Sequence, residues 1–370
     1  MPPQRRIIVF IAALLTLVFF FWPTHGPRPT IHNPPQSSQA KGDVQQQDES
    51  YLGSTKAGIA ANPDSASSAD TRTFTYPSYL RSGEPLRTAI AAEFKYDPNA
   101  KWPRYIWQTW KVSPSSGEFP ERFRYPEATW TEKHRYWVHE VITDAEAPLL
   151  LEHLYKGLPM VLEAYWAMPH PILKADFFRY LILLARGGVY SDIDTEALQP
   201  AESWLTEELD KGVGLVVGIE ADPDREDWAE WYSRRIQFCQ WTIMGKRGHP
   251  VLGEIVARIT EKTLKLKAQG QDALVKEWKN SVVEWTGPAA WTDAVFDHLD
   301  PALPPSEAWK PFAALPDRKK VGDVVVLPIT AFSPGMGHMG SKDVGDAMAM
   351  VKHEFEGSWK PEEERMKEGE

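Results

Sequence analysis

The pattern of apolar and polar positions divides the chain into three regions. An uninterrupted apolar run from Ile7 to Trp22 comes first, and a polar, aperiodic stretch then continues to about residue 100. From residue 101 to residue 360, short apolar runs of strand type alternate with segments of helical periodicity. Strands that alternate with helices predict an α/β layered domain with a largely parallel sheet.

Periodicity and composition predict the main elements of this domain. The segment 175–186 is predicted as a helix because it is rich in Leu, Phe and Ala and contains no breaker, and Gly187 and Gly188 would end it. Further helices are predicted at 147–155, 251–267 and 292–298, and strands at 105–110, 136–141, 189–193, 214–220 and 324–327. No internal repeat is visible in the sequence.

The apolar run 7–22 predicts a membrane anchor. Its 16 residues fall short of the ~20 that span a typical bilayer, but they suit a thinner membrane of the early secretory pathway. A cleaved signal peptide is the alternative, but the run ends in Phe19–Trp22, which is bulky and lacks a small-x-small cleavage site. Arg5 and Arg6 precede the run and favour a cytosolic tail at 1–6 with the bulk of the chain in the lumen, although Arg28 weakens this asymmetry.

The regions on either side of the predicted domain are polar. The segment 23–100 has too little apolar surface to offset the entropy of ordering, so we expect a flexible stem, with some order possible in the more apolar part 76–95. The charged segment 361–370 is expected to be a loose tail.

Composition and charge narrow the class of protein. The net charge of -10 argues against a nucleic-acid partner, since little would neutralise a phosphate backbone. It does not argue against a nucleotide diphosphate, because a bound divalent cation can reverse the local field. The single cysteine, Cys239, excludes an intrachain disulfide. The 16 Trp residues are compatible with stacking on sugar rings, although most of them are expected to be core.

Two closely spaced carboxylates are the first candidate for chemistry. Asp192 and Asp194 are two residues apart, so in an extended segment both side chains point to one face while Ile193 points to the other. Side-by-side carboxylates repel each other unless they are exposed or a cation lies between them. Mg²⁺ or Mn²⁺ meets that need with hard oxygen ligands and substrate phosphates. A solvated turn with two surface carboxylates is the alternative.

The predicted helix before this pair adds a second set of polar residues. Asp176, Arg179 and Tyr180 lie at positions i, i+3 and i+4 and therefore share one helical face. A helix, a Gly-Gly turn and a strand would bring an acid, a guanidinium and a phenol near the two aspartates. Arg suits diphosphate recognition through its planar fork. The alternative is a surface ion pair of little consequence.

The stretch 175–194 resembles the D-x-D region of the family 32 glycosyltransferases, which include fungal α-1,6-mannosyltransferases. The resemblance covers about residues 101 to 360 in order. The blocks that carry it are Arg104–Lys111, Gly218–Asp222, Gln237–Thr242, Gly248–Pro250, Thr286–Pro288 with Trp291–Asp293, and His353–Trp359.

This resemblance implies a GT-A type, Rossmann-like nucleotide-sugar-binding domain, Mn²⁺ (or Mg²⁺), GDP-mannose as donor and retention of anomeric configuration. Asp192 and Asp194 would hold the metal and the diphosphate, with His353 as a third ligand, and Asp176 and Arg179 would face the donor sugar. The implied substrate-binding residues are Trp107, Gln108, Tyr180, Gly187, Gly188, Glu220, Gln240 and Asp293.

Three functions remain open at this point. One is a Golgi α-1,6-mannosyltransferase of N-glycan outer chains, a single-pass type II membrane protein, with membership of a mannosyltransferase complex as a possible partnership. Another is a family member with a different sugar donor or a sphingolipid acceptor. The third is a non-catalytic, glycan-binding subunit of such a complex, which would have no reason to keep a costly carboxylate pair.

Overall fold

The computed structural model describes residues 85–223, 225–230, 232–299 and 307–357. The predicted anchor 7–22, the tail 361–370 and most of the predicted stem lie outside these residues. Within the described ranges, no helix combines the length and the apolar character that crossing a membrane requires.

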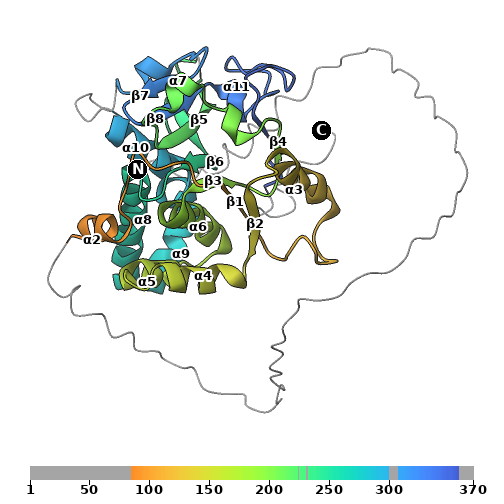
Figure 1. The fold of residues 1–370 in the computed structure, drawn as a ribbon. Helices are drawn as coiled ribbons and strands as arrows, with labels where there is room; N and C mark the ends of the chain where they lie inside the picture. The colour runs from red at the N-terminus through yellow and green to blue at the C-terminus, as the bar shows by residue number, and fades with distance from the viewer. Residues whose placement is uncertain (1–84, 224, 231, 300–306, 358–370) are drawn as a thin grey trace, which may run out of the picture. The chain divides into compact units, whose positions relative to one another are not determined.

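A seven-stranded sheet forms the centre of the domain, with strand order β2-β1-β3-β6-β5-β8-β7 (Figure 1). The strands are β1 (Tyr105–Trp110), β2 (Val138–Thr143), β3 (Gly188–Ser191), β5 (Leu215–Ala221), β6 (Gln237–Gly245), β7 (Lys319–Val321) and β8 (Val324–Leu327). A separate antiparallel pair joins β4 (Thr195–Ala197) to β9 (Val351–His353).

The sheet is mixed. The expected parallel arrangement holds for β2, β1 and β3, and for β5 with β8. The long strand β6 was not predicted, and it runs antiparallel to both β3 and β5, while β7 pairs antiparallel with β8. Because β6 is buried on both faces along most of its length, its sequence lacks the alternation of apolar and polar residues that marks a half-exposed strand.

Helices cover the sheet. They are α2 (Leu86–Glu93), α3 (Glu121–Lys133), α4 (Glu146–Leu154), α5 (Pro159–Ala167), α6 (Pro171–Arg186), α7 (Glu207–Asp210), α8 (Pro250–Ala268), α9 (Gln271–Trp285), α10 (Pro288–Leu299) and α11 (Ile329–Phe332). Short 3₁₀ turns lie at Ala201–Ser203, Trp228–Glu230 and Lys310–Phe312.

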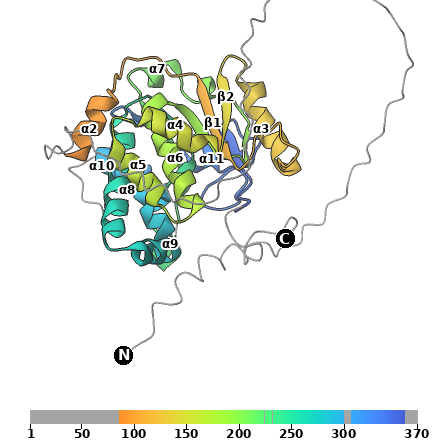
Figure 2. The same ribbon diagram turned by 90° about the horizontal axis from the view of Figure 1, so that it is seen from below.

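Two hydrophobic cores lie on the two faces of the sheet. The larger contains residues of α6, α8 and α10 together with Tyr190, Val217 and Ile243. The smaller packs Trp130 of α3 and Phe332 of α11 against strand residues such as Trp241. Figure 2 shows α3 beside β1 and β2, with α2, α8 and α10 grouped at another part of the domain. Layered burial of this kind is the α/β architecture that the sequence predicts.

The folded domain begins before residue 101, where we expected the stem to end. Helix α2 buries Leu86 and Ile90, and Phe94 follows it into the main core. Arg87 of α2 forms hydrogen bonds to Glu254 and Glu261 of α8 at 2.6 and 2.7 Å. Leu86, Ile90 and Phe94 are the buried core residues of this short segment. Three apolar positions are too few to reveal a helix within a polar stretch of sequence.

The helix α6 leads the chain into the site. His170 caps its first turn by accepting from the backbone N–H of Ile172, and Pro171 occupies the position where a missing N–H costs nothing. Gly187 and Gly188 follow with φ of 69° and 104°. A Cβ on Gly188 would lie 2.5 Å from the carbonyl oxygen of Tyr105, so this turn requires glycine both for its backbone angles and for the close approach of β1.

Candidate metal and donor site

Three residues from distant parts of the chain converge at the end of β3. Asp192 and Asp194 follow this strand directly, and His353 ends β9, opposite Thr195 of β4. One ligand atom from each of the three side chains lies within 4.8 Å of the others. The structure therefore brings together the three metal ligands that the resemblance implies.

The two aspartates lie in a turn. The strand ends at Ser191, two residues earlier than expected, and the backbone N–H of Thr195 donates to the carbonyl of Asp192 at 3.2 Å. The backbone N–H of Asp192 donates to the carbonyl of Trp241 on β6 at 2.8 Å. Ile193 points away into a small core with Phe119 and Phe123. Ile193 and the two carboxylates thus point in opposite directions, as expected, but a turn and not an extended backbone produces this arrangement.

His353 is held from several directions. Its ring stacks on the indole of Trp241 with centroids 4.7 Å apart, and Phe355 packs edge-on against it at 4.1 Å. Its Nε2 lies 3.2 Å from a carboxylate oxygen of Asp194. The segment after His353 also binds Asp194, since the backbone N–H of Glu354 donates to the Asp194 carbonyl and that of Glu356 donates to its carboxylate.

The charges at this point favour a cation. Burial raises the pKa of Asp192, even though the nearby Arg179 guanidinium works in the opposite direction. Burial opposes ionisation of Asp194 as well, but the charge and hydrogen bond of His353 and the backbone N–H of Glu356 together outweigh it and lower the pKa of Asp194. Two partly buried carboxylates and an imidazole form a donor set that suits Mn²⁺, so the residues present fit the metal that the resemblance implies.

Arg179 connects the two predicted groups of polar residues. Its Nη2 lies 3.0 Å from the carboxylate of Asp176 and 3.2 Å from that of Asp192. Asp176 also accepts from the hydroxyl of Thr286 at 2.8 Å. Burial raises the pKa of Asp176 to about 6, against the opposing effect of Arg179. The alternative of a surface ion pair is wrong, because Asp176 and Arg179 are only 2% and 3% exposed.

Tyr190 completes the contacts of Asp192. Its hydroxyl donates to the Asp192 carboxylate at 2.8 Å, and the guanidinium of Arg179 lies 5.2 Å from its ring centroid. Tyr190 and Arg179 both contact Oδ1 of Asp192, and no described residue forms a hydrogen bond to Oδ2. The second oxygen is therefore the one that a cation would use.

Tyr180 and Gln240 lie beside the Asp176–Arg179 pair. The Tyr180 ring stacks on Trp291 of α10 with centroids 5.4 Å apart. The Gln240 amide satisfies most partners when its nitrogen donates to the hydroxyl of Tyr180 at 2.7 Å and its oxygen accepts from Arg179 at 3.1 Å. Gln240 contacts Arg179 directly and links Tyr180 to it, but neither Tyr180 nor Gln240 contacts the three candidate metal ligands.

The predicted substrate-binding residues of β1 and the glycine turn have mainly structural contacts. Trp107 is 7% exposed, and its indole donates to the carbonyl of Gly187 at 2.9 Å. The Gln108 amide donates to the backbone carbonyl of Asp192 at 3.0 Å and so helps to fix the turn that contains Asp192 and Asp194. Gly187 and Gly188 lie at the opposite end of β3 from Asp192, a separation of about 13 Å for four residues of extended chain.

Glu220 and Asp293 lie apart from the Asp176–Arg179 pair. Glu220 of β5 has a buried carboxyl whose pKa burial raises to about 7. Asp293 of α10 accepts two hydrogen bonds from Arg234, both at 2.6 Å, and its side chain is 42% exposed. The structure therefore does not bring Asp293 to the candidate ligands.

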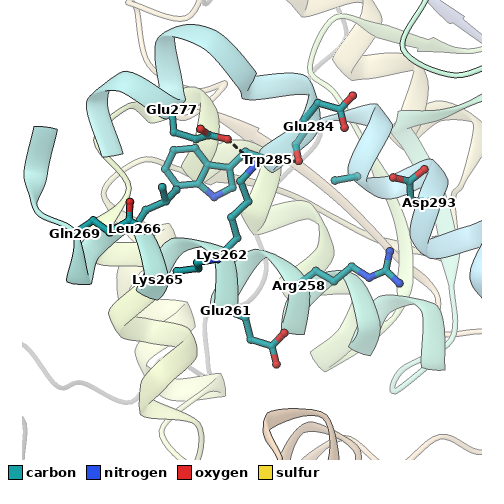
Figure 3. A pocket seen from close by; sticks show the side chains of 11 residues that line it. Arg258, Glu261, Lys262, Lys265, Leu266, Gln269, Glu277, Glu284, Trp285 and Asp293 are labelled. Carbon is teal, nitrogen blue, oxygen red and sulfur yellow. Dashed lines mark hydrogen bonds and ion pairs between the residues drawn. The ribbon is translucent and has the colours of Figure 1, made fainter. Parts of the chain in front are cut away.

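A surface hollow of about 610 Å³ lies between α8, α9 and α10, away from the aspartate turn (Figure 3). Asp293 is the predicted site residue that lines it. Lys262 bridges across it to Glu277 at 2.7 Å beside the buried Trp285. Because basic and acidic side chains already neutralise each other across this hollow, its charges select no ligand.

A second group of metal-type side chains contains His249, His298 and Asp323. The Nδ1 of His249 accepts from the backbone N–H of Val251 at 3.3 Å, which leaves the ring proton on Nε2, facing Asp323 at 3.2 Å. A protonated nitrogen cannot ligate a metal. Asp323 also accepts from Tyr96 and lies 2.9 Å from His298, so this group is a hydrogen-bonded network that joins the N-terminal segment to α8 and α10.

Three residues of the site were missed at the sequence level. Tyr190 lies two residues before Asp192, so the alternation of strand side chains would have placed it on the same face. Thr286 and Trp241 contact Asp176 and His353 across 110 and 112 residues, and no local spacing predicts such pairs.

Comparison with known proteins agrees with this geometry. The family described as "Glycosyltransferase sugar-binding region containing DXD motif" matches residues 120–210. The initiation-specific α-1,6-mannosyltransferase of Candida albicans is 47% identical over 294 residues, which cover 74% of this chain and 76% of that protein. The Saccharomyces cerevisiae protein of the same name is 33% identical, with 76% of this chain and 82% of that protein covered.

Two weaker similarities exist. Inositol phosphoceramide mannosyltransferase 3 of Schizosaccharomyces pombe is 30% identical over 102 residues, covering 28% of this chain and 27% of that protein. Among solved structures, PaToxG glycosyltransferase matches with a TM-score of 0.38 and 15% identity, covering 61% of this chain and 78% of that chain, which is too low to support an argument.

The D-x-D family match covers the aspartate turn and the helix before it, and the similarity to the Candida albicans enzyme extends over most of the domain. The chain therefore belongs to the family of glycosyltransferases with a D-x-D sugar-binding region that contains the initiation-specific α-1,6-mannosyltransferases.

Proposed function

We propose that this glycosyltransferase transfers mannose from GDP-mannose to a glycan acceptor, forming an α-1,6 linkage on N-glycan outer chains with retention of configuration. The observation that carries the proposal is the convergence of Asp192, Asp194 and His353 beside the buried Asp176–Arg179 pair. The names of the similar enzymes support mannose as the sugar and α-1,6 as the linkage. A GT-A type fold is part of the same proposal.

The chemistry follows from the charges in the site. A divalent cation held by Asp192, Asp194 and His353 would supply Lewis-acid stabilisation of the negative charge that builds on the departing diphosphate. Arg179 is charged at any physiological pH and is fixed by two carboxylates, so it places a second positive charge beside the same leaving group without reorganisation. Asp176 keeps Arg179 in orientation, since one of its carboxylate oxygens contacts Arg179 and the other accepts from the hydroxyl of Thr286.

The acceptor hydroxyl attacks as the bond to the diphosphate breaks. In retaining transfer of this kind the acceptor enters from the face that the leaving group departs from, so we assign no carboxylate nucleophile. The proton of the acceptor hydroxyl passes to the departing diphosphate oxygen, which keeps the charges balanced.

The cellular setting is a further part of the proposal. The apolar run 7–22 with Arg5 and Arg6 before it supports a single-pass type II anchor in the Golgi membrane, with the catalytic domain in the lumen. The polar segment from residue 23 would then hold the domain away from the membrane. Membership of a mannosyltransferase complex belongs to the same setting.

A second candidate function differs in the acceptor. The similarity of 102 residues to an inositol phosphoceramide mannosyltransferase favours a sphingolipid acceptor. It covers a much smaller part of the chain than the similarity to the α-1,6-mannosyltransferases does, so we place it second.

A donor and acceptor panel tests the proposal. The purified full-length chain is assayed with GDP-mannose, other nucleotide sugars, an N-glycan core and an inositol phosphoceramide, with and without Mn²⁺. We expect Mn²⁺-dependent transfer from GDP-mannose to the N-glycan, and we expect Asp192→Ala to abolish it while the domain stays folded. Transfer only to the lipid would establish the second function. A folded protein that is silent with every donor would make it a non-catalytic subunit.

A further inference from the structure

Buried polar atoms without partners gather behind His353. The Nδ1 of His353, the Nε1 of Trp241, an Oε2 of Glu220 and the Oε1 of Gln237 are all buried and lack a hydrogen bond from the described residues. Leaving such an atom unpaired is costly, so a group of them in one place calls for an explanation.

Three of the four side chains, those of Trp241, Glu220 and Gln237, belong to the large sheet, and His353 lies against it from β9. Gln237 and Trp241 are four residues apart on β6 and therefore point the same way, toward the smaller core that also contains Cys239. Glu220 lies on the neighbouring strand β5, between the pairings of Ile219 with Phe238 and of Ala221 with Gln237. The Gln237 amide lies close enough to the Glu220 carboxyl to lower its pKa, against the larger effect of burial. His353 covers this face by stacking on Trp241.

The donors and acceptors in this group are complementary. A histidine that binds a cation through Nε2 carries its proton on Nδ1, and that N–H needs an acceptor. The Nε2 of His353 is the atom that faces Asp194, so Nδ1 is the atom that must donate. Glu220 supplies a carboxylate oxygen on the same face, and the charges of Glu220 and His353 act on each other's pKa.

We propose that Glu220 is a positioning residue that accepts the Nδ1–H of His353 through one bridging water molecule and so directs the Nε2 lone pair at a divalent cation between Asp192 and Asp194. This inference rests on the proposed metal site. The resemblance implied that Glu220 contacts the substrate, whereas here Glu220 supports the metal ligand His353. Gln237 orients the Glu220 carboxyl in turn.

Binding of Mn²⁺ to the purified full-length chain, followed by the electron paramagnetic resonance of the free ion and without nucleotide, tests this role. We expect Glu220→Gln to raise the Mn²⁺ dissociation constant roughly 10- to 100-fold with little change in Tm. The matched control is Asp222→Asn. Asp222 follows the same strand, and its buried carboxylate pairs with Arg235 at 3.2 Å. We expect this variant to leave Mn²⁺ binding unchanged.

The outcomes separate this inference from the proposed function. If neither the native chain nor the Asp192→Asn variant binds Mn²⁺, the metal site itself is wrong and Glu220 loses its role with it. If the native chain binds, Asp192→Asn does not, and Glu220→Gln binds as tightly as the native chain, only the inference about Glu220 is overturned.

A second measurement needs no folded Glu220 variant. Nitrogen NMR of histidine-labelled native chain with Cd²⁺, with His353 identified by its loss in His353→Gln, reports which ring nitrogen carries the proton. A protonated Nδ1 is the expected result. An unprotonated Nδ1 would overturn the proposal whatever the variants do.

Discussion

The imidazole of His353 lies flat on the indole of Trp241, with ring centroids 4.7 Å apart and ring planes inclined by 15°. The same Trp241 accepts, through its backbone carbonyl, the N–H of Asp192. One residue of β6 therefore sets the position of two of the three candidate metal ligands, which are 161 residues apart in the sequence. The geometry of the site depends on this strand as much as on the D-x-D motif.

Loss of the Trp241 ring should weaken the metal site. Trp241→Leu keeps an apolar side chain but removes the surface on which His353 rests, so we expect the Mn²⁺ dissociation constant to rise about tenfold. The measurement is a Mn²⁺ titration of each folded variant. Trp166→Leu is the control, because Trp166 is 40% exposed and lies on α5. Equal Mn²⁺ affinities for the two variants would show that the stacking does not position His353.

Arg179 should not tolerate replacement by Lys. Its Nη2 contacts both Asp176 and Asp192 while its Nη1 donates to the Gln240 amide oxygen, and the single nitrogen of a lysine ammonium cannot span these partners. We expect kcat for mannose transfer to fall by about 10²-fold, as for removal of one preorganised donor. Arg258→Lys on α8, whose guanidinium pairs with Glu254 and Asp297, serves as the control in the same assay. A kcat for Arg179→Lys within threefold of the native value would contradict this role.

Gly188 should be irreplaceable for backbone reasons. Gly188→Ala places a Cβ 2.5 Å from the Tyr105 carbonyl oxygen at a φ of 104°, and we expect a loss of about 3 kcal/mol or more in the free energy of unfolding. Gly270→Ala is matched for backbone angle, with φ of 108°, but its Cβ meets nothing within 4 Å, so we expect a loss of about 1 kcal/mol. Urea unfolding of both variants gives the comparison, and similar losses would exclude the steric explanation.

The Asp323 network should stabilise the domain in a pH-dependent way. Hydrogen bonds from His249, His298 and Tyr96 outweigh the effect of burial and hold the pKa of Asp323 well below its ordinary value. The stabilisation is therefore present above the pKa of the unfolded state, near 4, and is lost as the pH falls below it. We expect Asp323→Asn to lower the free energy of unfolding by about 1–3 kcal/mol at pH 7.

The pH profile provides the check on this assignment. The difference between the native chain and Asp323→Asn should stay constant from pH 5 to pH 7 and shrink below pH 4, as measured by urea unfolding at each pH. A difference that grows as the pH falls would have the wrong sign for a carboxylate whose pKa is depressed by folding.

Much of this architecture follows from local patterns in the sequence. The spacing of Asp176 and Arg179 on one helical face and the pair Asp192 and Asp194 after a buried strand predicted two groups of polar residues that the structure joins through Arg179. These predictions hold because the geometry of a helix or a strand depends on neighbouring residues only. The same local reasoning set the end of β3 two residues late, since a turn also brings Asp192 and Asp194 together.

Tertiary structure alone decided which distant residues complete the site. His353 reaches Asp194 across 159 residues because β9 pairs with β4, and Trp241 supports it because β6 enters the sheet between β3 and β5. The resemblance implied Asp293 and the glycine turn as substrate-binding residues, yet Asp293 pairs with Arg234 and the glycine turn packs against Tyr105. Contacts of this kind depend on how whole faces of helices and strands bury against one another, which no short stretch of sequence specifies.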